Sequence, residues 1–358
     1  MAETDLIVRK DAPREGSWQT RDAAPLTPGQ ARLKIETMAL TANNVTYAIF
    51  ADFAGYWEHF PAADSDLGRV PFWGFATVSE TTLDDLPVGT RVYGYLPASS
   101  DLVVQPVAFD PSGFTDGSVH RAKLPAFYSR FHLTANDLAY QSDYEDEQML
   151  VRPLYATGWL IDDFLASKET PPAQVVVSSA SSKTALAYAH KAATRDGLVL
   201  TGLTSDRNKA FVESTGFYTN VLGYEELDQI PQTGPAIYTD FLGDPELRGK
   251  LEAALGDTMA STLAIGATAG AAVRQAGGTA PTRPVEQFFA PGHAEVCAKR
   301  LGPSEFFKTM NTDMTAFYPI ARNMITSRHI SGEADILSAW QSMVDGDVDP
   351  TEGLILRL

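Results

Sequence analysis

Two groups of polar side chains, separated by about 20 residues, have the types and spacing to hold a phosphorylated nucleotide. The first is the run of small residues 178–182 followed by Lys183, and the second combines Ser205, Arg207 and Lys209. Small residues let the backbone approach a phosphate closely, and cations beside a hydroxyl favour a ribose 2′-phosphate over an unmodified 2′-hydroxyl. The pattern therefore predicts a site for NADP rather than NAD.

A strand, a tight turn, a helix and a second strand are predicted to position these side chains. Val175–Val177 is an apolar β-branched run, the turn follows, and helical spacing of apolar residues continues to Gly197, before the strand Leu198–Leu200. A strand that enters a helix through a tight turn directs free backbone N–H groups at an anion on the helix N-terminus. The residues expected to contact the cofactor are Ser179, Ser181, Ser182, Lys183, Thr184, Ser205, Arg207, Lys209 and, from a preceding helix, Thr157.

The turn lacks the glycines that usually mark a dinucleotide site. Ser179, Ser182, Lys183 and Ala185 stand in their places, where glycine normally allows close contact between the backbone and a pyrophosphate. Serine and alanine fit this geometry at small cost, and Lys183 can add a charge-assisted contact to phosphate. An ordinary βαβ unit whose turn binds nothing is the alternative interpretation.

Five segments of the chain resemble, in order, the motifs of one superfamily. They are Ala31–Val45, Val70–Val78, Val88–Gly94, Arg152–Trp159 and Val175–Ala185, the last of which aligns without gaps on the pattern V-L-V-x-G-A-x-G-G-V-G. The chain is similar to the zinc-free, quinone-oxidoreductase-like branch of the medium-chain dehydrogenase/reductase superfamily. Where the chain departs from these motifs, it resembles a subgroup of the superfamily that is catalogued as a domain of unknown function.

The resemblance implies an α/β protein of two domains. The first is a GroES-like, β-barrel-type catalytic domain built from residues 1–148 and 286–358. The second is a doubly wound parallel-sheet (Rossmann) dinucleotide-binding domain over residues 149–285. A homo-oligomer, specifically a dimer, is expected as well.

Element patterns agree with this division. Short strands punctuated by Pro and Gly fill residues 1–115, whereas strands alternate with helices after Thr170. Two loops are predicted at Pro111–Leu124 and Gly266–Pro284, and a closing strand at Gly353–Leu358. At 358 residues the chain has ample length for two cores.

The positions that hold catalytic zinc in zinc-dependent relatives carry other residues here. Thr41 lies at the Cys position and Trp73 near the His position, and neither side chain is a useful zinc ligand. The chain has a single cysteine, Cys297, and its six histidines show no i, i+4 spacing with one another. We therefore expect no bound metal.

A zinc-free nicotinamide enzyme can reduce a carbon–carbon double bond conjugated to a carbonyl, provided that an acid returns a proton to the α-carbon. The resemblance places Tyr56 or Tyr47 in that role and gives Asn44 a part in orienting substrate or cofactor. The alternatives are an aromatic loop anchor for Tyr56 and a plain turn residue for Asn44.

Aromatic residues are dense around this loop, and they suggest the class of substrate. Trp57 and Trp73 lie in the dense stretch, Tyr128 could close the same pocket, and Arg130 could receive a carboxylate or phosphate. If these rings line a binding site, the substrate is a small apolar or aromatic compound. A surface salt bridge is the alternative for Arg130.

Composition limits the partners. The net charge of −17 argues against nucleic acid and anionic membranes, which require clustered Lys and Arg. No apolar run approaches the length of a membrane span, and a cytoplasmic location is the expectation. Three functions stay open: an NADPH-dependent reductase of an enone, quinone or similar carbonyl compound, a non-catalytic dinucleotide-binding protein, or a lyase or isomerase with NADP in a closed cycle.

Overall fold

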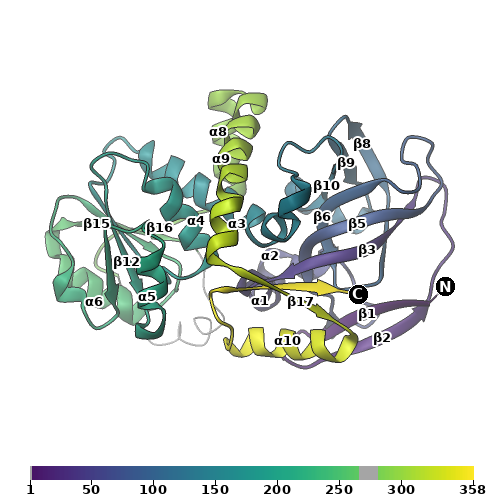
Figure 1. Cartoon of the computed structure of the whole chain (residues 1–358), viewed down its shortest axis with the longest axis horizontal. Coiled ribbons are helices and arrows are strands. Elements are labelled where there is room, and N and C mark those ends of the chain that lie inside the picture. The colour runs from purple at the N-terminus through teal and green to yellow at the C-terminus, as the bar shows by residue number, and fades with distance from the viewer. Residues whose placement is uncertain (1, 266–280) are drawn as a thin grey trace. The chain divides into compact units, whose positions relative to one another are not determined.

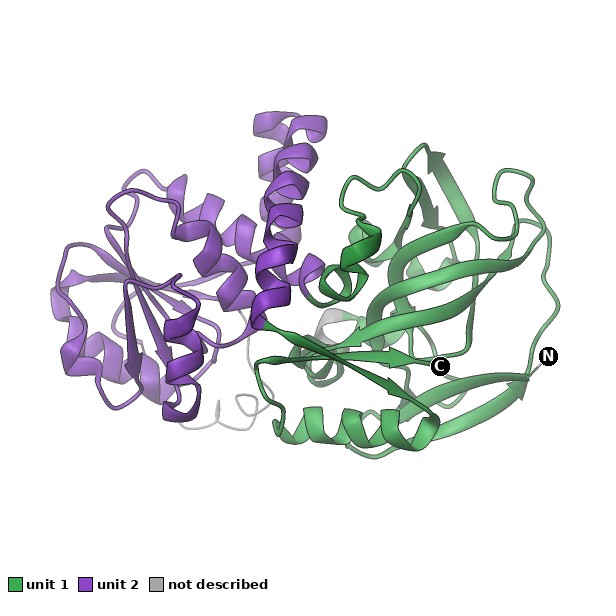
Figure 2. Cartoon of the chain, viewed as in Figure 1, with its two compact units in different colours: residues 1–150, 325–358 green, residues 151–324 purple. Residues whose placement is uncertain are grey.

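The computed structural model describes residues 2–265 and 281–358, apart from the side chains of Phe53 and Ala54. The chain forms two compact units: unit 1 contains residues 1–150 and 325–358, and unit 2 contains residues 151–324 (Figures 1 and 2). Most of the loop predicted at Gly266–Pro284 lies outside the described residues. Within the described part, no helix is both long and apolar enough to span a membrane.

Unit 1 is built on β-sheets. A three-stranded sheet has the order β2 (Gly16–Asp22), β1 (Ala2–Arg9), β4 (Leu67–Gly68). The larger, nine-stranded sheet runs β17 (Thr326–Ser331), β18 (Glu352–Arg357), β3 (Ala31–Leu40), β5 (Pro71–Thr81), β6 (Arg91–Pro97), β10 (Arg130–Leu133), β9 (Gly113–Asp116), β8 (Pro106–Asp110), with β7 (Asp101–Val104) also paired to β3.

The two ends of the chain meet in this sheet. Strand β18 pairs antiparallel with β3, with Leu354 opposite Leu40, so the C-terminal strand completes a sheet begun by the N-terminal segment. The helical segments of unit 1 are α1 (Ala42–Ile49), α2 (Ala51–Ala54), η1 (Tyr56–His59), η2 (Val119–Arg121), η3 (Ala126–Ser129), η4 (Ser142–Tyr144) and α10 (Glu333–Asp345).

One predicted loop of unit 1 is partly a strand. Within Pro111–Leu124, residues of β9 pair with β10 and place Phe114 opposite Phe131. Both rings are fully buried and stack with centroids 5.3 Å apart. The loop prediction was wrong here because burial of one aromatic residue outweighs the turn-forming composition around it.

Unit 2 is a parallel sheet of six strands. Their order is β13 (Asn220–Gly223), β12 (Val199–Thr204), β11 (Gln174–Val177), β14 (Ala236–Asp240), β15 (Met259–Ala264), β16 (Val285–Gln287), which is the 3-2-1-4-5-6 order of a dinucleotide-binding fold. The helical segments are α3 (Glu145–Ala166, which begins in unit 1), α4 (Lys183–Ala192), α5 (Asp206–Ser214), η5 (Leu227–Gln229), α6 (Pro245–Leu255), η6 (Gly256–Thr258), α8 (Ala290–Leu301) and α9 (Pro303–Met324).

Both faces of the parallel sheet are covered. Val175 and Val177 of β11 point into a core shared with α3 and α4, whereas Val176 points into the opposite core with α6. Alternate residues of a strand face opposite sides, so a continuous apolar run such as Val175–Val177 is typical of a strand buried on both faces. The predicted doubly wound α/β fold is confirmed.

The boundary between the two units after the parallel sheet differs from the boundary predicted from the sequence. The sequence pattern predicts that residues 286–324 belong to the first domain, whereas α8 and α9 belong to unit 2. Contacts with α3 account for this: Asp163 contacts His293 of α8, and the rings of Tyr155 and Phe317 of α9 lie 5.1 Å apart.

Candidate functional site

The turn after β11 is anchored by a buried hydroxyl. Ser178 Oγ donates to Asp240 Oδ1 (3.2 Å) and accepts hydrogen bonds from the N–H groups of Phe241 (3.0 Å) and Leu242 (3.1 Å). These contacts join the carboxyl ends of β11 and β14, neighbouring strands at the centre of the sheet. Ligands of such sheets bind at the carboxyl ends of the strands, where the strand order reverses.

Ser179 has a backbone conformation that usually requires glycine. Its φ is +51°, one of two positive values among the non-glycine residues that the structure describes. Its N–H donates to Tyr224 Oη (3.1 Å), and the next N–H, that of Ala180, donates to Leu203 O (3.0 Å). A left-handed serine costs on the order of 1 kcal/mol and persists where surrounding contacts enforce it, commonly at functional sites. Tyr224 was not identified from the sequence.

The N-terminus of α4 offers free donors. Ser182 is the N-cap and accepts a hydrogen bond from Ala185 N (3.3 Å). The backbone N–H groups of Ser181 and Thr184 have no partner within residues 2–265 and 281–358. Free N–H groups at the positive end of a helix dipole, beside the Lys183 side chain, are an arrangement that can hold an anion.

The second predicted group begins α5, close to this turn. Ser181 Oγ accepts hydrogen bonds from Asn208 Nδ2 (3.1 Å) and Thr204 Oγ1 (3.4 Å), so the turn and the end of β12 are in contact. Ser205 is the N-cap residue of α5. The Arg207 side chain is exposed and makes no ion pair or hydrogen bond with any residue that the structure describes.

Lys209 has an acidic partner that sequence reasoning missed. Its Nζ lies 2.6 Å from Glu226 Oε2, which also accepts the N–H of Gly223 (2.6 Å). These two hydrogen bonds lower the pKa of Glu226, so the carboxylate is charged at neutral pH. Arg207 is therefore the cation of this group that can turn to a ligand without breaking a contact.

Thr157 is not brought to the turn by a hydrogen bond. Its Oγ1 donates to Pro153 O (3.1 Å) within α3. The adjacent Gly158 has a clear packing role: a Cβ there would lie 2.5 Å from Tyr188 N of α4. The small residue at this position lets α3 and α4 pack with their backbones almost in contact.

Unit 1 gathers rings from five elements into one group, which we call the phenol cluster. Its members are Tyr47 (α1), Tyr56 and His59 (η1), Trp73 (β5), Tyr95 (β6) and Tyr128 (η3). Ring centroids lie 4.7 Å apart for Tyr47–Tyr56, 4.9 Å for Tyr95–Tyr128 and 4.9 Å for Trp73–Tyr95. The exposed ring of Phe127 lies 5.5 Å from Trp73, so the apolar surface continues to solvent.

The two candidate proton donors differ in environment. Tyr56 is half-buried, and its hydroxyl lies 3.4 Å from that of Tyr128. Tyr47 is buried, and its hydroxyl accepts hydrogen bonds from Asn43 and from Trp73 Nε1 (3.3 Å). Burial raises the pKa of both tyrosines. Both phenols are therefore protonated at neutral pH and able to donate.

Three predicted residues have contacts outside the phenol cluster. The Asn44 side chain accepts from Thr41 N (2.6 Å) and donates to Pro71 O (2.8 Å), which caps α1. The Trp57 ring covers Gly68, where a Cβ would lie 2.4 Å from it. Arg130 pairs with Asp110 (2.5 Å), the salt bridge named above as the alternative for it. Of the four predicted substrate contacts, Trp73 and Tyr128 lie in the cluster.

His59 was not identified from the sequence, although its spacing from Tyr56 places both on one side of a helical turn. It is fully buried, and neither ring nitrogen has a partner among the residues that the structure describes. Burial, together with nearby Arg121, lowers its pKa to about 3. A pocket of about 530 Å³ has His59 on its wall with Phe60, Arg69 and His120.

The positions expected to lack zinc ligands make other contacts. Thr41 Oγ1 lies 3.2 Å from Asn44 Oδ1, and the Trp73 indole donates to Tyr47. Among the described residues, one group of three potential metal ligands occurs elsewhere, in unit 2: Asp163, His293 and Cys297.

The sequence was compared with family profiles and with curated proteins. The profile of a family described as "Protein of unknown function (DUF2855)" matches residues 38–349. Among curated proteins, none matches the sequence.

Solved structures similar to this chain include oxidoreductases. CurA from Vibrio vulnificus in complex with NADPH has a TM-score of 0.61 at 12% identity and covers 99% of this chain and 98% of its own. The quinone oxidoreductase from Coxiella burnetii has 0.59 at 12% identity, covering 100% of each chain. A putative NADPH:quinone reductase from Bacillus thuringiensis has 0.59 at 13% identity, covering 100% and 99%. The likeness shows the fold, and the resemblance on which the two-domain fold was predicted is confirmed at that level.

Proposed function

The chain belongs to the DUF2855 family, and from this membership and its fold we propose that it is an NADPH-dependent oxidoreductase that reduces a conjugated or aromatic carbonyl compound, such as an enone or quinone, without catalytic zinc. The observation that carries the proposal is the turn 178–184, at the carboxyl end of a central parallel strand. Beside a left-handed serine, it leaves the N–H groups of Ser181 and Thr184 at a helix N-terminus without a partner among the described residues.

Unit 2 fits a phosphorylated dinucleotide. The N–H groups of Ser181 and Thr184, with Lys183, suit a pyrophosphate, and the Arg207 side chain, which has no partner in the part of the chain that the structure describes, suits a 2′-phosphate. At Gly202 a Cβ would lie 2.9 Å from the Ala180 Cβ, so a glycine is needed for the turn to lie this close to β12. NADPH, when bound, supplies a hydride.

Unit 1 supplies the acid that this reaction needs. The half-buried Tyr56 is protonated, and its hydroxyl lies beside that of Tyr128. One phenol can donate a hydrogen bond to a carbonyl oxygen, stabilising enolate character, while the other returns a proton to the α-carbon. The apolar rings of Trp73 and Phe127 suit a small apolar or aromatic substrate.

One observation favours a non-catalytic dinucleotide-binding protein as a second candidate. Tyr224 Oη already accepts the N–H of Ser179, and Glu226 already pairs with Lys209. Neither Tyr224 nor Glu226 is then available to orient a cofactor for hydride transfer, whereas the backbone N–H groups of Ser181 and Thr184 and the Arg207 side chain can still hold its phosphates. A protein that binds NADPH and turns over no carbonyl compound would fit this arrangement.

Fluorescence titration with NADPH and NADH, followed by NADPH oxidation assays with enones, quinones and aldehydes, tests the proposal. We expect NADPH to bind more tightly than NADH and at least one enone or quinone to be reduced. Thr184→Glu places a carboxylate beside the N–H groups at the start of α4. The helix dipole stabilises a negative charge there, so the variant should fold, but the carboxylate repels phosphate and should lower the affinity for NADPH. Thr184→Gln is the matched neutral control. Failure of wild-type protein to bind either nucleotide would reject the function, and binding without turnover would support the second candidate.

A further inference from the structure

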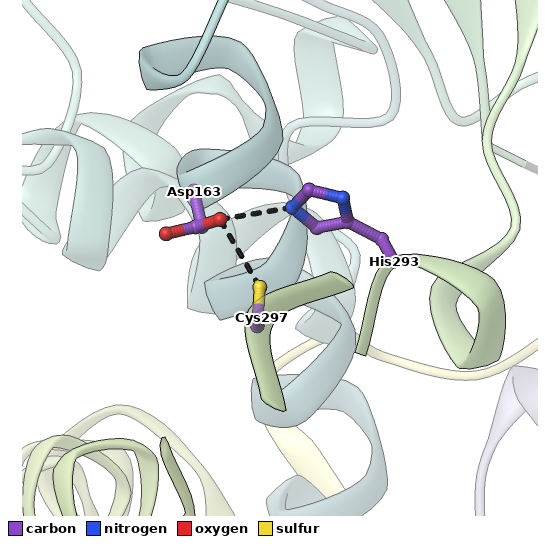
Figure 3. Close-up of side chains that lie close together, drawn as sticks. All are labelled: Asp163, His293 and Cys297. Atoms are coloured by element: carbon purple, nitrogen blue, oxygen red, sulfur yellow. Dashed lines mark hydrogen bonds and ion pairs between the residues drawn. The ribbon is translucent and has the colours of Figure 1, made fainter. Parts of the chain in front are cut away.

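A carboxylate, an imidazole and a thiol meet between α3 and α8 of unit 2 (Figure 3). Asp163 Oδ2 lies 2.9 Å from His293 Nε2 and 3.1 Å from Cys297 Sγ. One ligand atom from each of the three residues lies within 4.8 Å of the others. His293 and Cys297 are one helical turn apart, so they project from the same side of α8 toward α3.

The three groups are shielded from solvent and flanked by aromatic rings. Cys297 is fully buried, and the His293 and Asp163 side chains are 10% and 17% exposed. The rings of Phe164 and Phe288 flank the imidazole, with centroids 5.3 Å and 6.1 Å away. An apolar shell of this kind limits solvent access and strengthens the interaction of a cation with its ligands.

Arg300 orients the carboxylate. Its guanidinium contacts Asp163 Oδ1 (2.5 Å), the oxygen that faces away from His293 and Cys297. Oδ2 is thereby held toward the imidazole and the thiol. An outer group that fixes one oxygen of a ligating carboxylate is common around metal sites, and its loss typically weakens metal binding by about 10- to 100-fold.

We propose that Asp163, His293 and Cys297 bind one zinc ion, with a water molecule in the fourth position, and that this ion fastens α8 to α3. One sulfur, one nitrogen and one oxygen ligand at about 2.0–2.3 Å from zinc in a tetrahedral arrangement lie roughly 3.3–3.6 Å from one another. The two distances to Asp163 Oδ2 therefore need to open by about half an ångström, which side-chain rotation provides. Thiolate with imidazole selects zinc over magnesium or calcium.

The site differs from the catalytic zinc that the sequence argued against. The expectation of no bound metal depended on Thr41 and Trp73 in unit 1 and on the spacing of the histidines among themselves. All three ligands here belong to unit 2, and for this site the proposal replaces that expectation. The i, i+4 spacing that the six histidines lack among themselves occurs between His293 and Cys297. The inference is independent of the proposed reductase activity, and no step of that reaction uses the ion.

Metal content and cobalt spectroscopy of the full chain test the inference. Untagged protein should contain one equivalent of zinc by elemental analysis. The stripped protein titrated with Co²⁺ should develop tetrahedral visible bands and a thiolate-to-cobalt charge-transfer band that saturate at one equivalent. Zinc should then displace the cobalt and raise the unfolding temperature. Absence of both stoichiometric zinc and the cobalt spectrum in folded wild-type protein overturns the proposal. The three residues would then be only a hydrogen-bonded group between α3 and α8.

Variants assign the ligands. Cys297→Ser should abolish the charge-transfer band, and His293→Ala should weaken cobalt binding at least tenfold. His329→Asn alters a histidine of unit 1 that pairs with Asp146, and it should leave the spectrum unchanged. Circular dichroism confirms the fold of each variant. A charge-transfer band that persists in folded Cys297→Ser would also overturn the assignment. NADPH titration of stripped protein separates this inference from the proposed function, since nucleotide affinity should not depend on the metal.

Discussion

At the scale of single residues, the two candidate proton donors of unit 1 differ in burial and in the hydrogen bonds that they make. Tyr47 is buried and already accepts two hydrogen bonds, whereas Tyr56 is half-buried with a single long contact to Tyr128. A proton donor must be accessible to its substrate and must be protonated at the working pH. Both phenols meet the second condition, and Tyr56 meets the first better than Tyr47.

We expect Tyr56→Phe to lower turnover by about 10²- to 10⁴-fold, the usual effect of a lost general acid. The ring remains, so packing and NADPH affinity should change little. Tyr47→Phe is the matched control, and steady-state reduction of the best enone or quinone is the measurement. Normal turnover by Tyr56→Phe with a slow Tyr47→Phe would move the role to Tyr47. Full activity of both variants would mean that neither phenol is the donor.

Arg207 should decide the choice between the two nucleotides. Arg207→Ala should weaken NADPH by about 1.5–3 kcal/mol, the range for a hydrogen bond to a charged group, and leave NADH almost unchanged. Arg207→Lys retains charge and should show a smaller loss. The measurement is the ratio of the dissociation constants for NADPH and NADH. Equal losses for both nucleotides would show that the 2′-phosphate is held elsewhere.

His59 should make stability depend on pH in the acid range. Its pKa is about 3 in the folded protein against 6.5 as the ordinary value, so between these pH values the unfolded chain binds a proton that the folded chain does not. The free energy of unfolding therefore falls as pH falls from 6.5 toward 3, by up to about 1.4 kcal/mol per pH unit for this group.

Urea unfolding at pH 7, 5.5 and 4.5 measures this effect when wild type is compared with His59→Phe. Other titrating groups are common to both proteins, so the difference in slope reports His59. The variant should lose less stability on acidification. Identical slopes would contradict the lowered pKa.

At the scale of elements, the contact between α3 and α4 depends on Gly158. A methyl group there would meet the backbone of Tyr188 at 2.5 Å, and a backbone cannot rotate away as a flexible side chain can. Gly249 offers a matched comparison, because it also lies inside a helix, α6, and a Cβ there would meet no atom of the described residues within 4 Å.

Gly158→Ala should therefore destabilise the protein by about 1–3 kcal/mol, the range for overpacking. Gly249→Ala should stabilise it by roughly 0.5–1 kcal/mol, the difference in helix propensity between the two residues. Chemical denaturation of both variants gives the free energies of unfolding. A neutral or stabilising Gly158→Ala would show that α3 and α4 can separate without cost.

At the scale of the whole molecule, the two units differ in continuity. Unit 2 is one uninterrupted segment, residues 151–324, with an apolar core on each face of its sheet. Unit 1 needs both ends of the chain, because β18 pairs with β3. A continuous segment with its own cores satisfies the usual conditions for independent folding.

We expect the excised segment 151–324 to unfold cooperatively and to bind NADPH by itself. Circular dichroism during thermal unfolding and fluorescence titration are the measurements. The complementary fragment 1–150 should not fold alone, since it lacks the strands 326–331 and 352–357. A soluble but unfolded 151–324 fragment would contradict this expectation.

Local sequence patterns determined most of the fold. The β-branched run Val175–Val177, the small-residue turn and the apolar helical spacing after it specify strand, turn and helix without help from distant residues. The closing strand predicted at Gly353–Leu358 corresponds to β18, Glu352–Arg357. Such predictions succeed because strand and helix periodicity is encoded over a few neighbouring residues.

Only the tertiary structure decided which side chains meet. The phenol cluster draws rings from five elements, Lys209 is paired with Glu226 from beyond β13, and Asp163 contacts His293 across 130 residues of sequence. Each contact depends on sheet register and helix packing, which arise from burial summed over the whole chain rather than from local propensity. The sequence by itself therefore determined the scaffold and the turn that we propose binds an anion, whereas long-range packing decided the partners of the candidate proton donors and assembled the proposed metal ligands.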